Sequence, residues 1–97
     1  MVVLNSHTKD IRVRHIIDIK DSSYIVATAY QHSSNRTKCY LLDCQRGEIY
    51  SREHNHWNRV SDPFDYFEIQ RLIRKALSDE RIPKFSTDSA GLDSVLN

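Results

Sequence analysis

The hydrophobic periodicity of this chain changes once, at Asp62-Pro63, and this change limits the possible fold more than any other feature. Before it, apolar and polar residues alternate with a period of two, which is typical of β-strands. After it, apolar residues recur three and four positions apart, which is typical of one face of an α-helix. A series of strands followed by one helix predicts an α+β domain.

Four segments before Asp62 are predicted to form strands. Residues 11–20 alternate regularly, residues 24–31 are apolar on both faces, and residues 38–43 and 48–54 follow polar turns. The second segment is expected inside the sheet because both of its faces are apolar, and the polar fourth segment is expected at an edge. Because the connections are short, we expect a four-stranded antiparallel β-meander.

One C-terminal α-helix is predicted, from Pro63 to between Leu77 and Arg81. Asp62 is a favourable N-cap, and proline suits the first helical position because its missing N–H needs no partner there. Pro83 is expected to stop the helix. The residues predicted to form its buried stripe are Tyr66, Ile69, Leu72, Ile73, Ala76 and Leu77.

Two architectures fit these elements, an open sheet with the helix across one face or a small curled barrel of the SH3 or Tudor type. The segments that bear on this choice are Asp21-Ser22, Ala27-Thr28-Ala29-Tyr30, Asp43 and Arg46-Gly47. They resemble the corresponding stretch of Tudor-like domains, and no functional residue is carried over from that resemblance. The single domain is expected to span residues 1–83, and residues 84–97 are expected to form a polar, loosely held tail.

Length and composition exclude several classes of protein. The chain has 97 residues, of which 39% are hydrophobic and 28% charged, as in an ordinary globular domain. No apolar run approaches the roughly 20 residues of a membrane-spanning helix, and the first residues lack the basic segment of a signal peptide. We therefore expect a cytoplasmic protein that does not contact membranes, with Cys39 and Cys44 as free thiols.

No pattern typical of an enzyme is found in the sequence. With Gly47 and Gly91 as its two glycines, the chain lacks a glycine-rich phosphate loop. His54 and His56 are two apart on a predicted strand and would share a face, but no further ligand follows at a metal-site spacing. His15 lies on an apolar strand face and is expected to be a hydrogen-bonded core residue. We expect no catalytic residue, no cofactor and no bound metal; a metal-dependent enzyme at the two histidines is the third hypothesis.

The predicted helix carries aromatic residues outside its buried stripe. Phe64 and Phe67 fall among charged residues that include Arg71 and Arg74. Aromatic residues and arginine are enriched at protein interfaces, so these four residues are the predicted partner-binding site. In the competing interpretation, Phe64 folds back onto Trp57 and Phe67 covers an edge of the sheet, so that both rings are buried within the domain. The favoured function is a small non-catalytic protein-binding or regulatory module, such as an adaptor or an inhibitor of the phage or plasmid type. It would occupy a surface of a partner protein or of a second copy of the chain.

The predicted sheet supports an alternative function. Residues 1–60 contain nine lysines and arginines against six acidic residues, and tyrosines occur in several of the strands. Basic and aromatic side chains on one sheet face are typical of proteins that bind single-stranded RNA or DNA. The candidate nucleic-acid-binding residues are Arg12, Arg14, Lys20, Lys38, Arg46 and Arg52.

Overall fold

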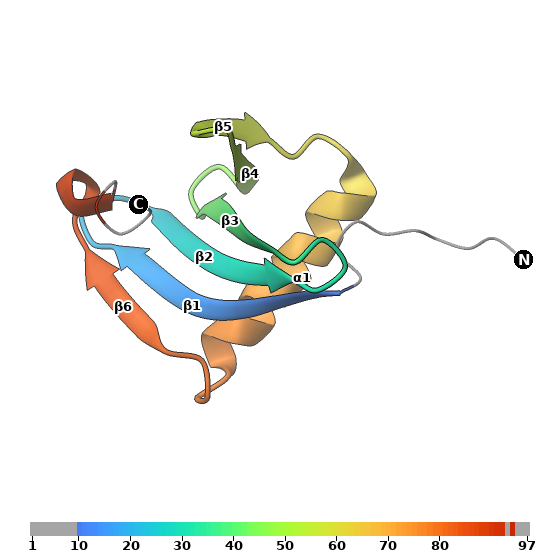
Figure 1. The fold of residues 1–97 in the computed structure, drawn as a ribbon. Coiled ribbons are helices and arrows are strands. Elements are labelled where there is room, and N and C mark those ends of the chain that lie inside the picture. Colours follow the sequence, from blue (N-terminus) through green and yellow to red (C-terminus); the bar gives the residue numbers. More distant parts are fainter. Residues whose placement is uncertain (1–9, 93, 95–97) are drawn as a thin grey trace, which may run out of the picture.

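The computed structural model describes residues 10–92 and 94, and it shows an open six-stranded sheet with one α-helix packed on it (Figure 1). The strands are β1 (Ile11–Ile19), β2 (Tyr24–Gln31), β3 (Arg36–Asp43), β4 (Glu48–Glu53), β5 (His56–Arg59) and β6 (Lys84–Thr87). The helix α1 spans Pro63–Ser78, and a short 3-10 helix, η1, spans Ser89–Gly91. The order of strands across the sheet is β5-β4-β3-β2-β1-β6.

The α+β class is confirmed, but the antiparallel meander is only part of the sheet. Strands β1 to β5 are antiparallel neighbours in chain order, whereas β6 returns after α1 and pairs in parallel with β1. The sheet is therefore mixed, and it is open rather than closed into a barrel of the SH3 or Tudor type. Strand β2 lies inside the sheet as predicted, but the edge position predicted for β4 is wrong because β5 lies outside it.

Strand β5 follows a turn that contains no glycine. His54 and Asn55 have φ angles of 51° and 65°, the left-handed conformation that both central residues of a tight type I′ hairpin turn need. Asparagine tolerates this conformation better than most residues. The reversal places Glu53 opposite His56. His54 therefore lies in the turn and His56 in β5, so the prediction that they share one strand face is wrong.

The predicted tail, residues 84–97, begins with strand β6. Its pairing with β1 is extended at both ends, because the Ile16 amide donates to the Pro83 carbonyl at 3.0 Å and the Lys20 amide donates to the Thr87 carbonyl at 2.8 Å. A four-residue polar edge strand has almost no hydrophobic signature, which explains why it was not predicted. Residues 93 and 95–97 of the expected tail, and residues 1–9 of the expected domain, lie outside the described residues.

A β-bulge in β1 redirects its side chains. Val13 opposes Ala29 and His15 opposes Thr28, so Arg14 is the extra residue. A one-residue shift moves every later side chain to the other face of the sheet. The residues of β1 that face α1 are Ile11, Val13 and Ile16. The residues that face the opposite side are His15, Ile17 and Ile19. The uninterrupted alternation predicted for residues 11–20 is therefore broken at Arg14.

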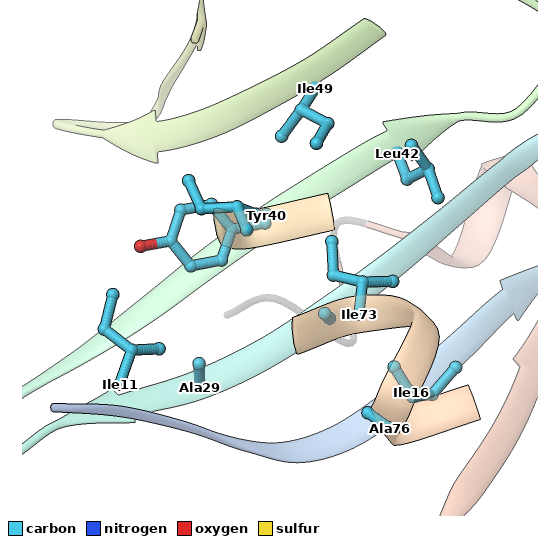
Figure 2. Packing of buried hydrophobic residues seen from close by; sticks show 10 residues of the cluster. Ile11, Ile16, Ala29, Tyr40, Leu42, Ile49, Ile73 and Ala76 are labelled. Atoms are coloured by element: carbon cyan, nitrogen blue, oxygen red, sulfur yellow. The ribbon is translucent and has the colours of Figure 1, made fainter. Parts of the chain in front are cut away.

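The main core lies between α1 and one face of the sheet, where side chains from the helix and from β1 to β4 meet (Figure 2). Its members are Ile11, Ile16, Ala27, Ala29, Tyr40, Leu42, Ile49, Ile69, Ile73 and Ala76. Within the predicted helix stripe, Ile69, Ile73 and Ala76 are buried, and Tyr66 and Leu72 pack against the core from its margin. The burial predicted for Leu77 is wrong: it is 37% exposed. Leu77 lies at the margin of the stripe, about 40° beyond Ile73 on the side away from Ala76.

The α-helix that the structure describes is too short and too polar to cross a lipid bilayer.

Candidate functional site

The outer face of α1 presents the four residues predicted to bind a partner, and we call Phe64, Phe67, Arg71 and Arg74 the helix surface. Phe67 is 64% exposed and Phe64 is 43% exposed. The competing interpretation requires both rings to be buried inside the domain, and neither of them is. Asp62 caps the helix by accepting a hydrogen bond from the Phe64 amide at 2.9 Å, which sets the start of the helix and therefore which residues face outward.

The helix surface carries positive charge. The Arg71 guanidinium donates to Glu68 at 2.9 Å, but an exposed pair of this kind is worth only about 0–1 kcal/mol. Among residues 10–92 and 94, Arg74 and Lys75 form no salt bridge. Together with Phe67 and Arg71 they line a shallow, open groove along the helix. The groove combines an exposed phenyl ring with cations that can bind carboxylates.

A second candidate surface lies on the face of the sheet opposite α1, which we call the uncovered sheet face. The strands curve away from the helix (Figure 1) and enclose a small core. The buried residues of this core are Ile17, Ile19, Val26 and Leu41. The residues packed around it are Cys39, Tyr50, Trp57 and Leu92. Leu92 follows η1, which Asp21 holds by accepting hydrogen bonds from the backbone amide of Ser89 at 2.9 Å and from its hydroxyl at 2.6 Å.

One row of residues crosses the uncovered sheet face beside this core. His15 opposes Thr28, which opposes Cys39, and Arg52 opposes Trp57 on the outermost hairpin. The Nδ1 atom of His15 lies 3.0 Å from the Thr28 hydroxyl, and the Arg52 guanidinium lies 5.4 Å from the centroid of the Trp57 ring. His15 is exposed, so its predicted core position is wrong. The bulge places it on the face of the sheet opposite α1.

Two further ring contacts extend this surface. The His15 and Phe85 rings are 5.6 Å apart between centroids, and Phe85 is 54% exposed on edge strand β6. The Arg14 guanidinium lies 4.8 Å from the centroid of the Tyr30 ring, within the range of a cation–π contact. The uncovered sheet face therefore has aromatic rings near both edges and a basic group beside two of them.

The structure gathers half of the predicted nucleic-acid-binding residues on one face. Three of them lie on the uncovered sheet face: Arg12 because it opposes Tyr30, and Arg14 and Arg52 because they contact the rings of Tyr30 and Trp57. The others lie elsewhere: Lys20 and Arg46 are in turns, and Lys38 opposes Ala29, which faces α1. Sequence reasoning missed Trp57 and Phe85. A hairpin turn predicted at Asn55 would have indicated that Trp57 pairs with Arg52. No local signal in the sequence indicates that Phe85 pairs with β1.

A cavity of about 310 Å³ opens where β3 and β4 separate beyond their last paired residues, Tyr40 and Ser51. Cys39 and Arg52 line it. Burial raises the pKa of the Cys39 thiol to about 11, although the nearby Arg52 acts in the opposite direction. A thiol that stays protonated at neutral pH is a poor nucleophile, so this cavity does not contain an activated cysteine.

In the part of the chain that the structure describes, no three histidine, cysteine or acidic side chains are grouped as metal ligands. Comparison with known protein families, curated proteins and solved structures gave no match. A fold does not by itself imply a function, so the features that bear on function are the helix surface and the uncovered sheet face.

Proposed function

We propose that this protein is a small non-catalytic binding module whose helix surface docks onto an acidic partner protein, as an adaptor or an inhibitor does. The observation that carries the proposal is the 64% exposure of Phe67 on the same helix face as Arg71 and Arg74. Fully burying a phenyl ring is worth about 1.5–3 kcal/mol, so a partner with an apolar pocket recovers much of that free energy.

The ring of Phe67 is supported before any partner binds. It packs edge-on against the Tyr66 ring, with centroids 5.4 Å apart and planes at 84°. Tyr66 in turn donates a hydrogen bond from its hydroxyl to the Gly47 carbonyl in the β3–β4 turn. An anchor that is already ordered loses less conformational entropy on binding. The contact with Tyr66 therefore supports a role for Phe67 in binding a partner.

The charge around Phe67 indicates which kind of partner fits. Arg71 and Arg74 lie four and seven positions after it and share its side of the helix. Their guanidinium groups can each bind a carboxylate through two parallel hydrogen bonds. Among the residues that the structure describes, Glu68 forms a salt bridge with Arg71 and not with Arg74. A partner with carboxylates around an apolar pocket therefore complements the helix surface.

The test compares wild type with Phe67→Ala and Arg74→Glu. Tagged protein is used to capture partners from the cells that express it, and proteins recovered by wild type but lost with both variants are purified for titration. We expect Phe67→Ala to weaken binding by more than ~2 kcal/mol, roughly 30-fold in Kd, while the free energy of unfolding changes by about 0.5 kcal/mol or less.

Phe85→Ala is the matched control, because it removes an exposed phenyl ring from the other side of the sheet. It is expected to leave partner binding unchanged. The proposal fails if Phe67→Ala lowers the melting temperature by several degrees and still binds normally when folded. Light scattering identifies a second copy of the chain as the occupant if wild type dimerises and Phe67→Ala does not.

A further inference from the structure

We propose that the uncovered sheet face binds single-stranded nucleic acid, with Trp57, Tyr30 and Phe85 as stacking positions and Arg12, Arg14 and Arg52 as phosphate ligands. This site is separate from the helix surface, because α1 packs on the opposite face of the sheet. The proposal therefore does not depend on the partner protein, and variants of each surface serve as controls for the other.

The geometry of the rings supports this ligand. Proteins that bind single strands without sequence preference combine aromatic rings, on which bases stack, with a basic surface that follows the phosphates. Arg52 lies 5.4 Å from the Trp57 ring and Arg14 lies 4.8 Å from the Tyr30 ring. A guanidinium plane resting on a ring also offers its outer side to a base. Each pair thus provides a stacking surface and a positive charge in one place.

The charge on this face is segregated. At the end that carries Arg12, Tyr30 and the row from His15 to Trp57, the paired strands contain one carboxylate, that of Glu53. Alternation along β4 places Glu53 on the α1 side with Ser51, which opposes Tyr40, so it does not lie on this face. At the other end of the sheet Glu48 opposes Asp43. Both acidic groups are already engaged. Glu48 forms a salt bridge with Arg59 at 3.3 Å, and Asp43 is buried and accepts hydrogen bonds from the backbone amides that follow it.

Asp10 brings a carboxylate close to the two N-terminal arginines, because it lines the same pocket as Arg12 and Arg14. Hydrogen bonding from the Ser33 side chain, and to a smaller extent from the Ser33 amide, which donates to this carboxylate, lowers the pKa of Asp10. Asp10 therefore stays ionised at neutral pH, but it is held toward the β2–β3 turn. At this end of the face, one carboxylate against the guanidinium groups of Arg12, Arg14 and Arg52 leaves a net positive charge.

The dimensions of the sheet suit a short single strand. Trp57 and Phe85 lie on the two outermost strands, β5 and β6. Five strand spacings of about 4.8 Å place them roughly 24 Å apart along the sheet. Small β-domains that bind single strands cover about 4–16 nucleotides. An acidic peptide would satisfy the arginines, but it would not use rings spaced across the whole face.

The test is fluorescence anisotropy with a labelled oligouridine of about 15 nucleotides. Each contact to a phosphate of a single strand contributes about −0.7 to the slope of the logarithm of the binding constant against the logarithm of the salt concentration. Three such contacts give a slope of about −2. Binding should therefore weaken about 20-fold between roughly 50 and 200 mM salt. Two probes separate stacking from charge: an abasic oligonucleotide of the same length and a polyglutamate peptide of the same length. Both are expected to bind at least fivefold more weakly than oligouridine, because each base stacked on a ring contributes at least that factor.

Trp57→Ala is expected to weaken oligouridine binding by roughly 5- to 150-fold, the range for losing one stacked base. Because Trp57 also packs against the small core, two exposed positions provide variants that spare the fold. Phe85→Ala is expected to lower affinity at least fivefold. Arg14→Gln should reduce the salt slope by about 0.7, so that the same salt change weakens binding only about sevenfold. Arg74→Gln on the helix surface is expected to leave both quantities unchanged.

Three results would overturn the proposal. One is the absence of oligouridine binding at low salt with protein at about 100 µM, the weak end of non-specific affinity. The second is equal binding of the abasic oligonucleotide or of polyglutamate, which would make the ligand a polyanion or an acidic polypeptide. The third is a loss of binding with Arg74→Gln as large as that with Arg14→Gln, which would move the site to α1.

Discussion

Truncation of Ile73 to alanine tests how α1 is attached to the sheet. Ile73 is fully buried in the main core. The substitution removes three carbon atoms, which at about 0.8 kcal/mol each amounts to roughly 2.4 kcal/mol of lost burial. The cavity left behind raises the expected cost to about 2–5 kcal/mol. A domain of this length has a free energy of unfolding of only about 5–15 kcal/mol, so the variant should melt roughly 10–30 °C lower.

The matched control is Leu77→Ala, four residues further along the same helix. The sequence pattern places both residues in the buried stripe, but Leu77 is 37% exposed and Ile73 is not exposed at all. We expect Leu77→Ala to cost about 1 kcal/mol or less. Urea unfolding followed by circular dichroism gives both free energies, provided that the dependence on denaturant is the same as in wild type. If Leu77→Ala costs as much as Ile73→Ala, the packing of α1 described here is wrong.

Two further predictions concern groups outside the proposed interfaces. In a Cys44→Ser variant, Cys39 should react very slowly with a thiol reagent at neutral pH and about tenfold faster per pH unit up to its pKa of about 11; rapid reaction at neutral pH would contradict its burial. Asp21→Ala should release η1 and speed hydrogen exchange at the Ser89 amide. Because the hydrogen bonds to Ser89 lower the pKa of Asp21, wild-type protection at Ser89 should be present above the unfolded pKa of about 3.9 and be lost as the pH falls through the lowered value. An unchanged exchange rate in the variant would show that other contacts hold η1.

The helix and its exposed aromatic residue could be predicted because the interactions that define them are local. Asp62 caps α1 through an amide two residues away, and helical hydrogen bonds close within four residues. Once the start of the helix is known, the angle between Ile73 and Phe67 follows from 3.6 residues per turn. The outward position of Phe67 therefore follows from a short stretch of sequence, whereas its proposed role as an interface anchor also depends on the partner.

At Leu77 and His15 the local hydrophobic pattern predicts burial that the tertiary structure does not show. Leu77 continues the apolar stripe, yet it lies at the margin of that stripe and is partly exposed. His15 continues the alternation of β1, yet the bulge at Arg14 places it on the face opposite α1. The bulge leaves one weak signal, because Ile16 stands where uninterrupted alternation expects a polar residue beside Arg12 and Arg14. An apolar residue there also fits a strand that is buried on both faces, so the pattern alone does not locate the bulge.

The sequence by itself determined the α+β class, the strands β1 to β4 and the helix, because alternation, turn residues and capping act over a few positions. Only the tertiary structure decided that Phe85 pairs beside Ile17 and contacts His15. That pairing joins residues almost 70 positions apart, and the free energy that holds a strand in a sheet comes from its neighbours rather than from its own sequence. The proposed nucleic-acid face, which combines residues from both edges of the sheet, exists only after these distant strands have come together.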